Sequence, residues 1–489
     1  MKRSVADFIK NEWIFIVLLI LVGGFSLYDL TEAPRTWYDE GMIMQLAQNL
    51  ATYGTMGTQI APGEFVSAAY TSTGYPLVAP IAGAFALFGE SLAVARLVMV
   101  AFILLLFSAS YVFVRRLAGR TYALAAAALL ATFSTLYGDG KNVLGEVPGL
   151  FFFVMFAIYA HRIFDEGVIT KKNAVLAGLF LGLCAATKPT FLVLGGAVCV
   201  GLIYAWIRKG ATIPLHIAFL ATGATLLPVL LWLITQFSLS DSPARVLSFY
   251  ANPYLLQDFS QVMSHNALRF LTEQTPMYLL GMVAVWGAAV VVRLVRKERI
   301  PFVEVVAISF TGLILMAYLR TPGWYRYLFP AQIVSMIFFP VALMHYVRWL
   351  SAWRFARAAR IGAVVLCAAL IGLQTYVLLF SSWVGTYYGA TTTAQMGQYF
   401  HGLNPDSIFF VYDIPEVVIF LPRGAPYYQY LSVNGSGYWE IGKEELAVIS
   451  ARIPDVLIIP SELAEGTTPL FPGYAKKTQI AGISVLERE

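Results

Sequence analysis

The chain has 489 residues, of which 58% are hydrophobic and 12% are charged. Soluble domains carry about 25% charged residues, so this composition excludes an aqueous globule for most of the chain and favours a lipid bilayer as its solvent. The 33 lysines and arginines exceed the 28 aspartates and glutamates by only five, a surplus too small to indicate a nucleic-acid partner. The three cysteines lie in apolar runs, so we expect neither a disulfide framework nor a zinc site.

About eleven apolar segments approach or reach the roughly 20 residues that a membrane span requires. The first segment has no small-residue cleavage site and is followed by many more, so we interpret it as a retained span and not as a removed signal peptide. The predicted spans are residues 13–30, 92–114, 122–136, 147–163, 174–186, 191–207, 213–237, 277–295, 302–319, 328–347 and 361–380.

The basic residues predict the orientation of these spans. With the N-terminus in the cytoplasm, the inner loops receive most of the lysines and arginines, among them Arg115, Arg116, Arg296 and Lys297. The positive-inside rule requires this asymmetry. If residues 75–89 also spanned the membrane, every later basic loop would move outside. That segment holds two prolines, and we predict a non-spanning re-entrant or interfacial helix there.

The first outer loop holds two adjacent carboxylates, Asp39 and Glu40, in the stretch APRTWYDEGMIMQLAQNLATYG. Apolar residues follow at helical spacing, which predicts an amphipathic helix lying in the interface plane of the membrane. These apolar residues are Met42, Leu46, Leu50 and Tyr53.

Charged and aromatic residues recur in the later outer loops. The second, YGDGKNVLGEVPG, holds Asp139, Lys141 and Glu146, and the third is a TKPT corner that holds Lys188. The fourth loop, residues 238–276, holds Arg245, Tyr250, Tyr254, Asp258, His265 and Arg269. The fifth, LRTPGWYRYLFP, holds Arg320, Trp324, Tyr325, Arg326 and Tyr327.

Residues 381–489 are less hydropathic and alternate short strand-type runs with helix-like ones. The runs SIFFVYD, DVLIIP and GISVLE predict strands, and PEVVIFL and GKEELAVISARI predict helices, so we expect a small α/β domain. An odd number of spans places it outside the membrane. The NGS sequence at Asn434 fits a glycosylation sequon, although Asn-Gly is more often a turn.

Each polar residue also has a simpler structural interpretation. Asp39 could cap the helix that follows it, and Glu146 could be a first-turn acid that the helix dipole favours. Lys188 and Arg326 could extend to lipid headgroups, and the Trp and Tyr residues could form an aromatic belt. Because acids and bases recur at one membrane level on several loops, we favour a polar cavity at the lipid boundary. It would suit a substrate with an apolar tail and an anionic head.

The sequence resembles the GT-C superfamily of integral-membrane glycosyltransferases, in particular the bacterial branch of protein O-mannosyltransferases and lipid A aminoarabinose transferases. The resemblance covers roughly residues 13–380. It is carried by YDEGMIMQLAQNLATYG after the first span and LFGESLAVARL before the second, and by LGEVPGLFF, GLFLGLCAATKPTFLVL and WYRYLFPAQ in this order. It implies a transmembrane catalytic domain over residues 1–380 and an extracytoplasmic α/β domain over residues 381–489.

The family transfers a sugar from a polyprenyl-phosphate carrier to an acceptor at the outer face of the cytoplasmic membrane. The resemblance implies that Asp39 is the catalytic base, that Glu40 orients the acceptor or supports Asp39, and that Glu146 is a second acid. Five further residues would bind the donor. The cations Lys188, Arg326 and Arg96 would contact its phosphate, and Tyr327 and Asp139 would complete the binding site. The acceptor would be a lipid, a glycan or a protein, and membrane lipids would surround the spans. No cofactor is implied, and a metal site is not expected, because no His- or Asp-rich cluster occurs in the outer loops.

Two other functions share the substrate class. A transporter or flippase of lipid-linked sugars would carry ionisable residues at the bilayer midplane and internal repeats, whereas here the charges lie at the outer ends of spans. A polymerase or ligase of lipid-linked glycans would depend on arginine pairs in large outer loops, and YDE after the first span is not its mark.

Overall fold

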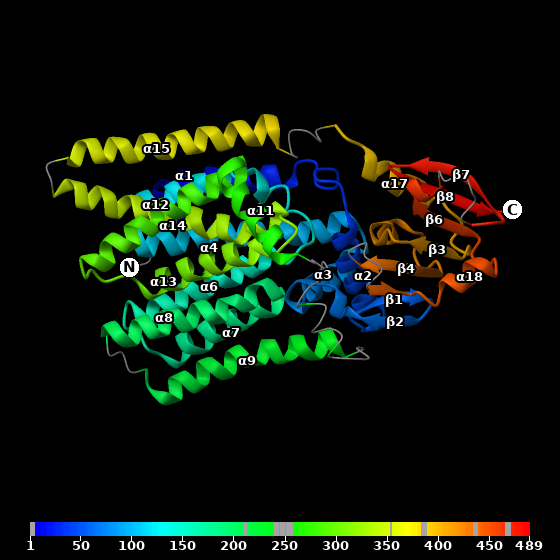
Figure 1. The fold of residues 1–489 in the computed structure, drawn as a ribbon, viewed down its shortest axis with the longest axis horizontal. Helices are drawn as coiled ribbons and strands as arrows, with labels where there is room; N and C mark the ends of the chain where they lie inside the picture. The colour runs from blue at the N-terminus through cyan, green and yellow to red at the C-terminus, as the bar shows by residue number, and fades with distance from the viewer. Residues whose placement is uncertain are drawn as a thin grey trace.

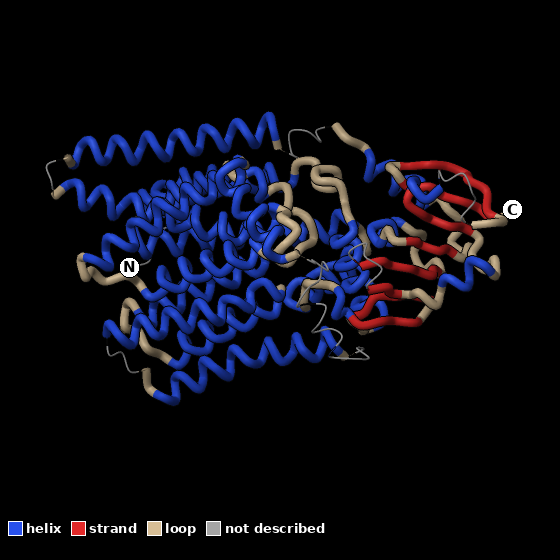
Figure 2. The backbone as a smooth tube through the Cα atoms, in the orientation of Figure 1, coloured by secondary structure: helices blue, strands red, loops and turns tan. Residues whose placement is uncertain are grey.

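The computed structural model describes residues 5–209, 213–238, 244, 250, 258–352, 355–382, 389–433, 439–464 and 471–489. It consists of a long helical bundle with a smaller, strand-containing domain at one end (Figures 1 and 2). Two expected features, the sequon at Asn434 and the loop residues Arg245 and Tyr254, lie outside the described residues. The N-terminus lies toward the bundle end that is remote from the strands (Figure 1). We call the other end the domain end.

All eleven segments predicted to span the membrane form helices. They are α1 (Val5–Leu27), α4 (Leu92–Ala118), α5 (Arg120–Ala131), α6 (Glu146–Phe164), α7 (Lys171–Thr187), α8 (Val193–Lys209), α9 (Leu215–Phe237), α12 (Gln274–Val295), α13 (Phe302–Leu319), α14 (Phe329–Ser351) and α15 (Ala356–Tyr376). Among the described residues, eight of these helices are long and apolar enough to cross a membrane, counting the turn before α8 and α14 and the turn after α15. The other three are α1, α5 and α7, so the number of crossings stays a prediction.

Packing within the bundle separates a buried centre from a lipid-type surface. Helix α14 is buried along most of its length and contacts α4, α5, α12, α13 and α15. By contrast, α9 and α15 expose large apolar side chains, among them Leu227, Ile234 and Val364. A soluble protein rarely exposes such continuous apolar surfaces, whereas they are the normal lipid-facing surface of a membrane protein.

The connection between α1 and α4 contains α2 (Tyr38–Tyr53), a hairpin of β1 (Gly57–Ala61) and β2 (Glu64–Ser67), and α3 (Tyr75–Phe88). Helices α2 and α3 form a layer between the bundle and the C-terminal strands, whereas the hairpin lies beside those strands (Figure 1). Helix α3 has 14 residues and is about 21 Å long, too short for a hydrocarbon core of about 30 Å. The predicted short helix at residues 75–89 is therefore present.

The predicted helix after Asp39 is also present, but it does not lie at a free interface. One side of α2 packs on α3, and another packs on η6 (Pro415–Phe420) of the C-terminal domain. Met42 and Leu46 are buried as expected, and Glu40, Gln45 and Asn49 are buried too. The C-terminal domain therefore covers a side of α2 that the apolar spacing alone leaves to water.

The C-terminal domain contains a six-stranded sheet in the order β5-β4-β3-β6-β8-β7. Central β3 (Phe409–Tyr412) runs parallel to β4 (Tyr427–Val433) and β6 (Val456–Pro460), whereas β5 (Trp439–Ile441), β7 (Tyr474–Ile480) and β8 (Ile483–Arg488) pair antiparallel to their neighbours. The predicted α/β domain is thus confirmed. The run PEVVIFL forms the 3₁₀ helix η6, and the run before Arg452 forms the short α18 (Leu446–Ser450).

Two side chains of the first loop hold the C-terminal domain. The Glu32 carboxylate accepts hydrogen bonds from the backbone N–H groups of Thr393 and Ala394, at the start of α17 (Thr392–His401), at 2.8 and 2.7 Å. Such a carboxylate satisfies helix N–H groups that have no partner within the helix. Arg35 donates to the carbonyl of Ala481, in the turn between β7 and β8. The loop that leads to Asp39 is therefore anchored to the last strands of the chain.

Candidate active site

A cavity of about 740 Å³ lies where the domain end of the bundle meets the C-terminal domain. Its volume is in the range of small-molecule sites, which is about 300–1,000 Å³. Its wall comes from the start of α2, the segment after β2, the turn between α7 and α8, the end of α13 and the segment before α14. Tyr250, Phe259 and the C-terminal domain add the rest. Its charged lining residues are Asp39, Lys188, Arg320, Arg326 and Asp413. We call it the first cavity.

Asp39 and Arg326 form an ion pair at the wall of this cavity. Asp39 is the second residue of α2, and the N-cap is Trp37, whose side chain makes no capping hydrogen bond. The capping interpretation of Asp39 is therefore wrong. Its Oδ2 lies 2.5 Å from Arg326 Nη1, and its side chain is 40% exposed. The carboxylate thus holds a cation on one side and remains open to the cavity.

Aromatic rings enclose the guanidinium of Arg326. Its Cζ lies 4.6 Å from the ring centroid of Trp37, 4.8 Å from that of Trp324 and 5.3 Å from that of Tyr327. Arginine over aromatic faces at these distances is a cation–π arrangement, which is stronger where water is excluded. Arg326 is 11% exposed, so it does not extend to headgroups. The rings hold its planar donor group at the cavity wall, and Tyr327 also lines the cavity.

Lys188 and Glu146 form a second ion pair. Lys188 follows the last residue of α7, and its Nζ contacts Oε1 of Glu146, the first residue of α6. Both side chains are nearly buried, at 6% and 9% exposed, so Lys188 does not extend to headgroups either. Glu146 is indeed a first-turn acid, as its simpler interpretation predicts, and it also holds Lys188. Lys188 lines the cavity, whereas Glu146 lies behind it.

Asp139 lies in the turn before α6, outside the lining of the first cavity. Burial, and after it the negative charge of Glu146, raise the pKa of its carboxyl to about 6, while Arg326 and Lys188 oppose the shift. Asp139 thus influences both cations of the site through its charge. The structure does not place it as a direct contact for a ligand in the cavity.

Glu40 and Arg96 form a fully buried pair away from the cavity. Arg96 donates through Nε and Nη2 to the two oxygens of Glu40, at 2.9 and 2.7 Å, and through Nη1 to the carbonyls of Leu30 and Pro34. A further bond to Asn142 uses its fifth N–H. With all five N–H groups committed, Arg96 is not available to a lipid phosphate, and that expectation is corrected. Glu40 faces Arg96 and not an acceptor, so it can support Asp39 only by fixing the start of α2.

The C-terminal domain adds residues that the sequence alone did not single out. Asp413 and Ser432 line the first cavity, and Asp413 Oδ1 accepts the backbone N–H of Ser432 at 2.7 Å. Asp413 directly follows β3 and has φ +57°, a left-handed conformation that aspartate tolerates better than most residues. Burial and the charge of Asp413 raise the pKa of the neighbouring Tyr38. A signal was present, because Asp413 ends a predicted strand, where α/β folds place functional groups.

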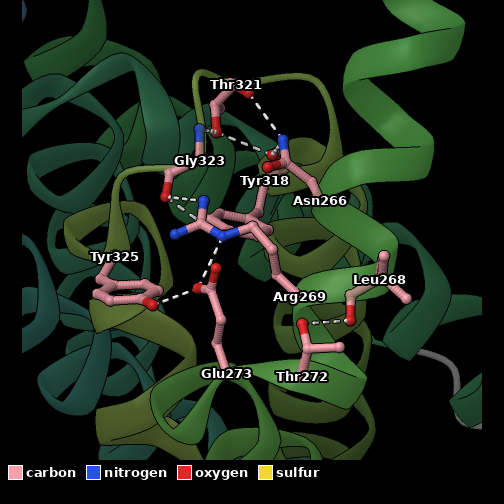
Figure 3. A network of polar contacts seen from close by, with 9 residues as sticks. All are labelled: Asn266, Leu268, Arg269, Thr272, Glu273, Tyr318, Thr321, Gly323 and Tyr325. Atoms are coloured by element: carbon pink, nitrogen blue, oxygen red, sulfur yellow. Dashed lines mark hydrogen bonds and ion pairs between the residues drawn. The ribbon is translucent and has the colours of Figure 1, made fainter.

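A polar network supports the segment that carries the fifth-loop residues (Figure 3). Asn266 of α11 (Phe259–Thr272) donates to three carbonyls at the end of α13, which have no partner within that helix. Arg269 donates to the carbonyl of Gly323 and to Glu273, which also accepts the hydroxyl of Tyr325. Gly323 has φ +85°, and a side chain there would collide with Arg269. The network therefore fixes the approach to η4 (Tyr325–Leu328), the turn that holds Arg326.

Among the described residues, no group of three or more His, Cys, Asp or Glu side chains is placed to hold a metal ion. In the described part of the chain, the charged groups that line the first cavity are two carboxylates, Asp39 and Asp413, and three cations, Lys188, Arg320 and Arg326.

Comparison with known proteins relates this geometry to a family. Residues 76–234 match the family model described as dolichyl-phosphate-mannose-protein mannosyltransferase. The fold is similar to ArnT from Cupriavidus metallidurans bound to undecaprenyl phosphate, with a TM-score of 0.67 and 14% identity, over 96% of this chain and 97% of that one. It is also similar to the Archaeoglobus fulgidus oligosaccharyltransferase tethered with an acceptor peptide, with a TM-score of 0.55 and 13% identity, over 94% of this chain and 70% of that one. The chain has the GT-C fold.

The resemblance to the GT-C superfamily that the sequence predicts is thus confirmed. The similarity extends through the C-terminal domain, because it covers nearly the whole chain of the GT-C protein ArnT. A search among curated proteins found no significant match.

Proposed function

We propose that this GT-C protein is a glycosyltransferase that moves a sugar from a polyprenyl-phosphate-linked donor to an acceptor hydroxyl at the outer face of the cytoplasmic membrane. The observation that carries the proposal is the convergence of Asp39, Arg326 and Lys188 on one cavity. These residues come from three loops that are far apart in sequence. The similarity to a protein bound to undecaprenyl phosphate supports a lipid-phosphate donor.

The first cavity has separate surfaces for the two ends of such a donor. Ile314, Ala317 and Val193 give it an apolar wall between α13 and α8, where an isoprenoid tail can reach lipid. Lys188 and Arg326 are placed to bind the phosphate, Arg326 through its planar donor group. The donor sugar would then occupy the space toward Asp39 and the C-terminal domain.

In the proposed reaction, the acceptor hydroxyl oxygen attacks the anomeric carbon of the donor sugar. Asp39 accepts the hydroxyl proton as the new carbon–oxygen bond forms. The bond between the anomeric carbon and the phosphate oxygen breaks, and its electron pair stays on the phosphate. Attack opposite to the leaving group inverts the anomeric configuration. Base assistance of this kind is worth about 10²–10⁴ in rate.

The cations stabilise the leaving group, because negative charge grows on the phosphate as that bond breaks. In the structure, each is paired with a carboxylate, Arg326 with Asp39 and Lys188 with Glu146. A bound phosphate would draw Arg326 toward itself and leave Asp39 free to accept a proton. The ion pair therefore links donor binding to the availability of the base.

A transporter is the weaker alternative. The first cavity lies at one end of the bundle, against the C-terminal domain, and not at the middle of the helices. Transport requires a site near the bilayer midplane to which both sides have access. No observation favours the polymerase or ligase alternative over the proposed transferase.

The test incubates the purified full-length protein with a panel of radiolabelled polyprenyl-phosphate sugars and a heat-treated membrane extract as the source of acceptors, and it follows consumption of the donor. We expect one class of donor to be consumed and Asp39→Asn to lower the rate by at least about 10²-fold. Asp406→Asn, on an exposed turn, is the matched control and should retain the rate. Near-normal activity of Asp39→Asn would remove Asp39 from the mechanism, and consumption of no donor would contradict the proposed function.

A further inference from the structure

A second cavity, of about 710 Å³, lies at the other end of α2. Its lining includes Gln48 and Tyr53, which come nine and fourteen residues after Asp39. At 1.5 Å per residue they lie about 14–21 Å from Asp39 along the helix axis. The end of α3, the turn of the β1–β2 hairpin, His401, the end of η6 and residues 421–427 complete the wall. A ligand here would be too far from Asp39 to present the reacting hydroxyl.

The wall of the second cavity offers several polar groups around one carboxylate. Glu90 accepts hydrogen bonds from Gln48 Nε2 at 3.3 Å and from Thr52 Oγ1 at 3.2 Å. An ionised carboxylate has about four acceptor positions, so Glu90 can accept further hydroxyl groups. Arg423 is exposed and can donate, and its Nη2 lies beside Gly89, the residue before Glu90. Acceptors and donors in one cavity suit a ligand with many hydroxyl groups.

Apolar and aromatic surfaces accompany these groups. Phe85 and Ile419 are buried in the wall, and the Tyr53 ring is 56% exposed and packs on Phe65 with centroids 5.2 Å apart. A sugar ring presents both hydroxyl groups and apolar C–H faces, and this lining matches both. A phosphate headgroup would be attracted by Arg423 and repelled by Glu90, whereas neutral hydroxyl groups can form hydrogen bonds with both.

The loop on the domain side is held in a fixed shape. It reads Leu-Pro-Arg-Gly-Ala-Pro over residues 421–426, and its two prolines restrict the backbone. Gly424 has φ +76°, which most residues do not adopt, and Ala425 N–H donates to the carbonyl of Pro422 at 3.1 Å. Pre-formed loops lose less entropy when a ligand binds.

The second cavity also lies at the membrane boundary. Glu90 is two residues before Leu92, where the 27-residue apolar helix α4 begins. Leu87 and Phe88, at the end of α3, are 78% and 77% exposed. Side chains of this kind at the start of a span insert into the interfacial region of a bilayer. The rim of the cavity therefore contacts lipid on one side and the aqueous phase on the other.

We propose that the second cavity binds the saccharide portion of a membrane-anchored glycan, at sugar residues remote from the reacting hydroxyl. This inference rests on the proposed function in one respect, since the glycan would be the acceptor of the transferase. The cavity would then select acceptors by the sugars that they carry about 14–21 Å from the site of transfer.

The first experiment measures binding of the full-length protein in detergent to an array of neutral oligosaccharides. We expect Ala86→Trp, which fills the cavity from an exposed lining position, and Glu90→Ala to weaken binding at least tenfold. Leu87→Trp, next in sequence but outside the lining, should bind like the wild type, as should Asp39→Asn. Unchanged binding by Ala86→Trp and Glu90→Ala, or no binding by the wild type, would overturn the inference.

The second experiment separates free from membrane-anchored saccharide. A glycan that binds on the array is attached to a lipid and displayed on vesicles. These vesicles should bind the protein more tightly than the free glycan does. The double variant Leu87→Ser/Phe88→Ser should abolish this difference. If the double variant keeps the full difference, the membrane-anchored part of the inference is wrong. Array binding does not require sugar transfer, so its outcome is independent of the donor-consumption assay.

Discussion

Charged side chains at the first cavity act in pairs, so a single substitution can lower activity and stability at the same time. Lys188 neutralises Glu146 where both side chains are nearly buried, and Arg326 neutralises Asp39 where the carboxylate is partly open. Removing one member of a buried pair leaves an uncompensated charge, whereas removing both members does not. Loss of activity in a Lys188 variant could therefore come from instability alone.

A paired substitution separates these two effects. Lys188→Met should lower the free energy of unfolding by about 3–5 kcal/mol, because Glu146 is left nearly buried without a counter-ion. The double variant Glu146→Leu/Lys188→Met should regain most of that stability and still show little sugar transfer, since the phosphate-binding cation is absent. Thermal unfolding in detergent and the donor-consumption assay measure the two properties. A double variant with restored activity would show that Lys188 serves only stability.

Asp139 provides a pH-dependent prediction. Its pKa of about 6 in the folded protein exceeds the usual value of 3.8, so the folded state favours the protonated form. Folding stability then falls as the pH rises from about 4 to about 6, and the loss is complete above that range. At pH 7.5, Asp139→Asn should raise the free energy of unfolding by up to about 3 kcal/mol, and the melting temperature should rise with it. The gain should vanish near pH 4, and Asp406→Asn should show none at either pH. An equal gain at both pH values would contradict the assigned titration.

At the level of elements, α2 was predicted from its apolar spacing, but its surroundings were not. The spacing of Met42 and Leu46 identifies one buried face and does not distinguish water from another protein surface on the opposite side. On that side Gln45 Nε2 donates to Gln429 Oε1 of β4 at 2.7 Å. Polar residues of this kind form hydrogen bonds with each other inside a contact, although the apolar spacing of the sequence predicts that they face water. The β1–β2 hairpin was missed because its strands have five and four residues and little apolar alternation.

Gly41 tests the contact between α2 and the C-terminal domain. A Cβ at this position would lie 2.3 Å from the backbone nitrogen of Glu416, so the two elements would have to separate. We expect Gly41→Ala to destabilise the protein by about 1–3 kcal/mol or more through overpacking, and to lower kcat because Asp39 lies two residues away. Gly83→Ala in α3, where a Cβ meets nothing within 4 Å, is the control and should be neutral or slightly stabilising. Normal kcat in Gly41→Ala would separate this contact from catalysis.

At the level of the whole molecule, the sequence predicted the helical segments and the domain at the end, because long apolar runs and alternating strands are local signals. It also predicted that Asp39, Lys188 and Arg326 would share a cavity, since all three follow or precede spans at one membrane level. It could not predict which carboxylate pairs with which cation, because those contacts join residues 287 and 42 positions apart. Only the packing of the helices determines whether Glu40 or Glu146 pairs with a given lysine or arginine.

Orientation is tested by labelling. Helices α4, α12 and α14 begin near the first-loop layer or the first cavity and carry basic residues in their last turns, at the opposite end. The positive-inside rule then predicts that the C-terminal domain lies on the extracytoplasmic side of the membrane. Lys443→Cys, exposed on that domain, should react with a membrane-impermeant maleimide in intact cells. Glu166→Cys, between α6 and α7, should react only after permeabilisation, with the unmodified chain as background. The reverse pattern would invert the orientation.

The hydrogen bonds of Glu32 to α17 and of Arg35 to the turn between β7 and β8 have a consequence for biosynthesis. The partners of Glu32 and Arg35 lie 361 and 446 residues further along the chain, so they are synthesised long after Asp39. Until the C-terminal domain has been made, the segment that presents Asp39 lacks these anchors, and α2 has one uncovered side. We therefore expect chains that stop before this domain to insert their helices and stay inert, so that competence for sugar transfer requires the C-terminal domain.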